Sequence, residues 1–80
     1  MTAAGDPAAP GDRLLDVRGL PAPEPLELCL QALDELGPAQ RLQLLIDREP
    51  HPLYAMLERA GFRHGCVLEP PHYHVTIWRD

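Results

Sequence analysis

A change from strand-like to helical periodicity within a few residues constrains this fold most, and three prolines mark it. The run Arg13–Arg18 is short and rich in apolar residues, which predicts a first strand. The segment PAPEP at residues 21–25 would by itself indicate an extended linker. Proline is nevertheless tolerated in the first turn of a helix, where backbone N–H groups have no intrahelical partner. Pro23 therefore fits the first helical position, Pro25 fits the first turn, and Glu24 lies at the positive end of the helix dipole.

The segment after the prolines has the apolar period of an amphipathic helix. One stripe carries its apolar side chains, namely Leu26, Cys29, Leu30, Leu33 and Leu36. Leu28 is expected to point away from this stripe, and Gly37–Pro38 ends the helix. This segment predicts a helix with one face packed on a sheet.

Four further elements are predicted, with a turn at Pro70–Pro71 between the last two. They are a strand at Arg41–Asp47, a helix at Pro52–Ala60, and strands at Phe62–Glu69 and His72–Trp78. The apolar face of the second helix carries Leu53, Met56, Leu57 and Ala60.

The order β-α-β-α-β-β predicts an α+β two-layer sandwich. Right-handed crossovers place both helices on one face of a mixed four-stranded sheet. The other face is then open, and alternation along the last strand puts His72, His74, Thr76 and Trp78 on it. Residues 1–11 are expected to form a disordered tail, and residues 12–80 a single domain.

Composition excludes several classes of function. A formal net charge of -5 argues against binding to nucleic acid or to an anionic membrane. The start of the chain lacks the pattern of a secretory signal, and no run approaches the length of a membrane span, so a cytoplasmic location with reduced thiols is expected. The sequence contains no serine and no Gly-rich nucleotide-binding motif. No cofactor is expected.

The run LDVRGLPAPEP at residues 15–25 resembles the TusA/SirA-like sulfur-carrier proteins. Their signature is a Gly-Leu step followed by Cys-Pro-x-Pro at the start of the first helix, and the cysteine carries a persulfide. Here PEP at 23–25 is retained and the matching position is Ala22. Together with DREPHPLY at 47–54, this resembles a branch without the carrier cysteine and without a settled activity. The resemblance covers nearly all of residues 12–80, and it implies a respiratory or redox-linked setting.

The candidate site is the edge formed by the loops that follow the first two strands. Ligands favour the carboxyl ends of parallel strands, and two helix N-termini there would offer free N–H groups to an anion. The expected side chains are Arg18, Ala22, Glu24, Asp47, Arg48, Glu49 and His51. A protein partner or a small anionic ligand would fit this edge. A purely structural alternative has Asp47 and His51 capping the second helix while the arginines pair with Glu24 and Glu49.

Two alternatives involve other side chains. Cys29 or Cys66 could handle sulfur or redox chemistry, although Cys29 lies on the buried stripe. If the turn pairs Glu69 with His72, Cys66 also faces the core.

A metal could instead bind through His72 and His74, with Glu69 joining them across the turn. His64 and Cys66 fall on the opposite face of the sheet in this register, which makes a four-ligand His/Cys site geometrically awkward.

The open sheet face is a further candidate surface. Val67, His74 and Trp78 are expected to be partly exposed there, and the edge strand could pair with a second copy to form a homodimer. These observations together predict a non-enzymatic binding module on a sulfur-carrier-like fold, with the thiol and metal hypotheses as alternatives.

Overall fold

The computed structural model describes residues 11–79. Its elements follow in the predicted order, as β1 (Arg13–Asp16), α1 (Glu24–Asp34), β2 (Leu42–Ile46), α2 (His51–Arg59), β3 (Phe62–Glu69) and β4 (His72–Arg79). Apart from Gly11, the tail predicted over residues 1–11 lies outside the described residues. Within residues 11–79, no helix is long and apolar enough to cross a membrane.

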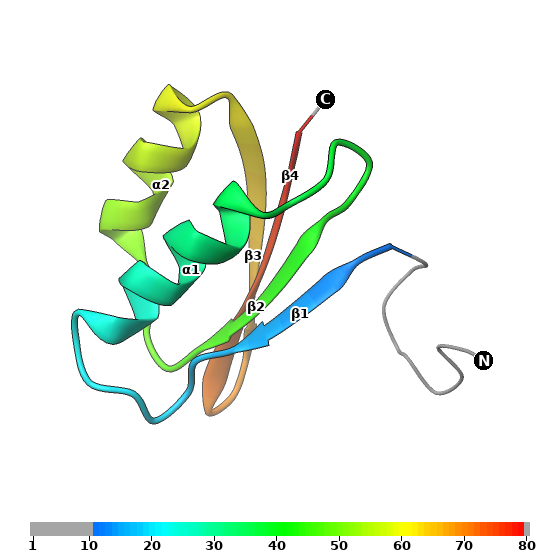
Figure 1. The fold of residues 1–80 in the computed structure, drawn as a ribbon. Coiled ribbons are helices and arrows are strands. Elements are labelled where there is room, and N and C mark those ends of the chain that lie inside the picture. The colour runs from blue at the N-terminus through cyan, green and yellow to red at the C-terminus, as the bar shows by residue number, and fades with distance from the viewer. Residues whose placement is uncertain (1–10, 80) are drawn as a thin grey trace.

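The four strands form one mixed sheet in the order β1-β2-β4-β3. β1 and β2 are parallel, whereas β2 with β4 and β3 with β4 are antiparallel. Both helices lie on the same face of this sheet (Figure 1). The predicted α+β two-layer sandwich is therefore confirmed. The predicted hairpin register is confirmed as well, because Glu69 pairs with His72 and Cys66 with Val75.

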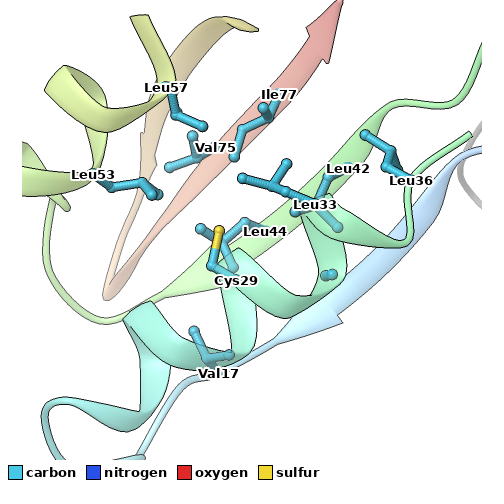
Figure 2. Close-up of a cluster of buried hydrophobic side chains, with 11 residues drawn as sticks. Val17, Cys29, Leu33, Leu36, Leu42, Leu44, Leu53, Leu57, Val75 and Ile77 are labelled. Carbon is cyan, nitrogen blue, oxygen red and sulfur yellow. The ribbon is translucent and has the colours of Figure 1, made fainter. Parts of the chain in front are cut away.

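The hydrophobic core fills the layer between the helices and the sheet (Figure 2). On the sheet side, the core consists of Leu42 and Leu44 of β2 and Val75 and Ile77 of β4. Buried residues of α1 and α2 pack against them from the helical side. The buried residues are Val17, Cys29, Ala32, Leu33, Leu36, Leu42, Leu44, Leu53, Leu57, Val75 and Ile77. Removing this apolar surface from water is the main favourable term in folding.

The buried face of α1 differs from the predicted stripe. Leu33 is 6% exposed, but Leu30 is 38% exposed, and Ala32 is buried instead. Leu28, predicted to point outward, packs partly buried against the core. The reason is that α1 and α2 lie on the same face of a four-stranded sheet, and the surface between the two helices is not fully covered. Leu30 faces a shallow surface hollow between them, together with Met56 of α2. Met56 and Ala60, predicted on the apolar face of α2, are exposed for the same reason.

Candidate functional site

The loops after β1 and β2 meet at one edge of the sheet, as the parallel pairing of these strands predicts. The backbone N–H of Gly19 donates a hydrogen bond to Oδ2 of Asp47 over 2.6 Å, which joins the two loops. Gly19 has a φ of +81°, a conformation that favours glycine. The loops enclose an open hollow of about 590 Å³. It is lined by Val17, Gly19, Leu20, Pro21, Ala22, Pro25, Ile46, Asp47, Arg48, Glu49 and Pro50.

Only part of the predicted edge lines this hollow. Ala22, Asp47, Arg48 and Glu49 do, whereas Arg18, Glu24 and His51 do not.

Arg18 turns toward the open sheet face. Its Nη2 donates to Oδ2 of Asp16 over 2.7 Å, and its Nη1 lies 3.5 Å from Nδ1 of His72. The hydrogen bonds from Arg18 lower the pKa of Asp16 to about 2. The Asp16 carboxylate, only two residues away in the chain, thus holds the Arg18 guanidinium away from the hollow between the loops.

The purely structural alternative, in which Asp47 and His51 cap the second helix and the arginines pair with Glu24 and Glu49, differs from the observed contacts. The N-cap residue of α2 is Pro50, and no side chain in the described part of the chain makes a capping hydrogen bond to this helix. The Asp47 carboxylate accepts from Gly19 in the other loop, and His51 lies 3.4 Å from Oε1 of Glu49. The expected pairing of Arg18 with Glu24 or Glu49 is replaced by its contact with Asp16.

Both helices begin with the same three-residue pattern, Pro-x-Pro. Pro23, Glu24 and Pro25 start α1, and residues 50–52 (PHP) start α2. In each case the first proline is the N-cap residue and the second lies in the first turn. Pro23 is therefore the N-cap residue and not the first helical residue, so α1 begins one residue later than predicted.

This pattern leaves few N–H groups for an anion. Proline has no N–H, so Pro25 and Pro52 remove one donor from each first turn. The Glu24 N–H donates to the Pro21 carbonyl over 3.0 Å, and the His51 N–H donates to the Glu49 carbonyl over 3.0 Å. Acidic side chains also follow in the first turn of α1. The two helix N-termini thus offer an anion fewer free N–H groups than the sequence predicted.

An apolar groove lies between the two helix starts, and we call it the Pro-x-Pro groove. Its volume is about 250 Å³. All of its lining residues are apolar, and they are Ala22, Pro23, Pro25, Leu26, Cys29, Leu44, Ile46, Pro50, Pro52 and Leu53. Sequence reasoning missed this groove, although the repeated Pro-x-Pro pattern was a signal for it.

Neither thiol is an exposed nucleophile. Cys29 lies at the base of the groove with 1% exposure, and burial raises its pKa to about 11. Cys66 is half-buried and faces the core, as predicted. The Tyr54 hydroxyl donates to Oε2 of Glu49 over 3.1 Å, and burial together with the neighbouring Cys66 and Glu49 side chains raises the pKa of Tyr54.

The predicted metal candidates lie close together on the open sheet face. Oε1 of Glu69 is 3.5 Å from Nε2 of His72 and 3.5 Å from Nδ1 of His74. Nε2 of His74 lies 2.7 Å from Oε1 of Gln43, so its other ring nitrogen is engaged. Across residues 11–79, no group of three or more His, Cys, Asp or Glu side chains is arranged to hold a metal ion.

Comparisons with known proteins place this geometry in a family. The model of a family described as an uncharacterised conserved protein, DUF2249, matches residues 14–79. The chain belongs to this family. The crystal structure of a SirA-like protein from Desulfitobacterium hafniense is similar to it, with 28% sequence identity and a TM-score of 0.69. That match covers 80% of this chain and 92% of the SirA-like chain. No curated protein matches this sequence.

The family and the structural match support a sulfur-carrier-like domain of the SirA/TusA type. Ala22, which the sequence resemblance aligns with the carrier cysteine, is exposed and lines both the hollow and the Pro-x-Pro groove.

Proposed function

We propose that this member of the DUF2249 family is a non-enzymatic binding module that holds a segment of a partner protein in the Pro-x-Pro groove. The observation that carries the proposal is the groove itself, since every residue lining it is apolar. Full burial of one aliphatic or aromatic side chain of a partner contributes about 1.5–3 kcal/mol. Four prolines form part of the walls, and their fixed φ angles reduce the conformational entropy lost on binding.

The charges around the groove favour a basic partner segment. Glu24 and Glu27 lie in the first turn of α1. Asp47 and Glu49 line the adjoining hollow, where Arg48 is the counterbalancing cation. The hollow and the groove share Ala22 as a lining residue, so these charges flank the groove. We infer a partner segment with an apolar anchor flanked by Lys or Arg, because opposite charges across an interface favour encounter and register.

Photo-crosslinking tests this proposal. A photo-crosslinking amino acid in place of Ala22 is expected to capture a protein segment that carries an apolar residue next to Lys or Arg. The matched control is the same amino acid in place of Ala55, which is exposed on α2 and lines none of these hollows. Capture should weaken as salt is raised, since exposed charges are then screened.

Two results would contradict the proposal. One is that position 22 captures nothing that position 55 does not capture. The other is that the segment captured at position 22 is acidic or lacks an apolar residue. The respiratory or redox setting implied by the resemblance would be tested by the identity of the captured protein.

A further inference from the structure

β3 forms an edge of the sheet. Among residues 11–79, in the order β1-β2-β4-β3, it pairs with β4 only. In an antiparallel ladder alternate residues direct their N–H and C=O groups to the neighbouring strand. The remaining backbone groups of β3 therefore point away from the sheet, where they can pair with another strand.

This edge lacks several of the features by which proteins block such pairing, namely a short strand, a proline and a bulge. β3 is 8 residues long, contains no proline, and pairs with β4 in continuous register without a bulge. Its centre, residues 65–68 (GCVL), carries no charge. Val67 is 60% exposed and Leu68 is 56% exposed. By contrast, β1, the opposite edge, has only 4 residues.

The charges of β3 are arranged symmetrically about its middle. Arg63 precedes Cys66 by the same number of residues as Glu69 follows it. Both lie on the open sheet face, because they pair across the ladder with Trp78 and His72 of β4. An antiparallel copy of this strand, centred on Cys66, would place Arg63 opposite Glu69 and Glu69 opposite Arg63.

We propose that β3 pairs with β3 of a second copy of this chain, antiparallel and about a two-fold axis at Cys66. The register is set by two Arg63–Glu69 pairs, one at each end of the paired segment. It also places Val67 opposite Gly65, so that the exposed valine covers a residue without a side chain. The two sheets become one continuous sheet with the helices of both copies on the same face. This association is independent of the groove between the helix starts.

Charge reversal tests the register. Arg63→Glu and Glu69→Arg each bring like charges together in both pairs, and each is expected to weaken self-association about tenfold or more. The double variant restores both pairs and should associate like the natural protein. An equimolar mixture of the two single variants should also associate, because one copy then carries two acidic and the other two basic residues at these positions. Sedimentation equilibrium measures all of these states.

Two further variants complete the experiment. Arg48→Glu changes the net charge as Arg63→Glu does but lies in the loop after β2, so it should leave association unchanged. Val67→Asp introduces a charge at the exposed centre of β3 and is expected to abolish pairing even if a charge-reversed variant fails to fold.

Three results would overturn the proposal. The natural protein could remain monomeric up to about 1 mM, which leaves no meaningful association free energy. Val67→Asp could associate as tightly as the natural protein. The mixture of single variants could associate no better than either variant alone, which would exclude the Arg63–Glu69 register.

Discussion

At the scale of single residues, Ala22 stands where the sequence resemblance places the sulfur of a carrier protein. It is exposed just before the start of α1 and borders both the hollow and the Pro-x-Pro groove. The N–H groups of Glu24 and His51 are already bonded to loop carbonyls. A thiol at this position would therefore owe its reactivity to exposure more than to free donors at the helix ends.

Ala22→Cys is expected to fold normally and to give a thiol that reacts with an alkylating reagent about a hundredfold faster than Cys29 near pH 8. The reason is that burial raises the pKa of Cys29 to about 11, whereas the new side chain is exposed to water. Mass spectrometry of the labelled residues over time measures both rates. Comparable rates at the two positions would show that residue 22 is covered.

The two natural thiols test the sulfur-handling alternative. In the natural protein, Cys29 is expected to stay unlabelled until the chain unfolds, because it is buried in the core. Cys66, half-buried and packed against the core, is expected to react slowly. Labelling of native and urea-unfolded protein gives the comparison. Rapid labelling of either cysteine in the native protein at neutral pH would favour sulfur or redox chemistry over simple binding.

The contact between Asp16 and Arg18 predicts a pH dependence. Hydrogen bonds from Arg18 lower the pKa of Asp16 to about 2 in the folded state, below its value of about 3.9 in an unfolded chain. The stability that this contact provides is therefore complete above about pH 4 and is lost as the pH falls toward about 2. Asp16→Asn should lose less stability over that range than the natural protein in urea unfolding. An equal loss in both would mean that Asp16 is not held by Arg18 in solution.

At the scale of elements, α1 offers a matched pair of leucines. Leu33 is buried among the core residues, whereas Leu30 faces the shallow hollow between the helices. Leu33→Ala is expected to lower the free energy of unfolding by about 2–4 kcal/mol, because it leaves a cavity in the core. Leu30→Ala should cost less than about 1 kcal/mol, as is usual for exposed positions. Urea unfolding measures both, and equal losses would support the stripe predicted from the sequence.

The fold was predictable because each element carries its own local signal. The helical period after residue 25 and the alternation in residues 72–78 depend only on neighbouring residues. The site was predictable only in part, since the parallel-strand rule brings the loops together without fixing their side chains. The direction of Arg18 depends on Asp16, and the Pro-x-Pro groove depends on how α1 and α2 sit over β2. Such relations involve several elements, so local periodicity does not contain them.

At the scale of the whole molecule, the sheet is asymmetric. β2 and β4 are central and each pairs with a strand on both sides, whereas β1 and β3 form the edges. The central strands also provide Leu42, Leu44, Val75 and Ile77, the floor of the core. β1 contributes only 4 residues to the sheet, and its Leu14 is exposed. Local opening should therefore begin at β1, while the central strands open only with the whole domain.

Native-state hydrogen exchange tests this asymmetry. The slowest amides are expected in β2 and β4 and should exchange with the free energy of global unfolding, because their hydrogen bonds break only when the core does. Amides of β1 should exchange faster through local opening. The experiment is run at low protein concentration, so that any pairing of β3 between copies does not protect that edge. If β1 amides exchanged as slowly as those of β2, the four-residue edge would open only with the core, and the sheet would be a single cooperative unit up to that edge.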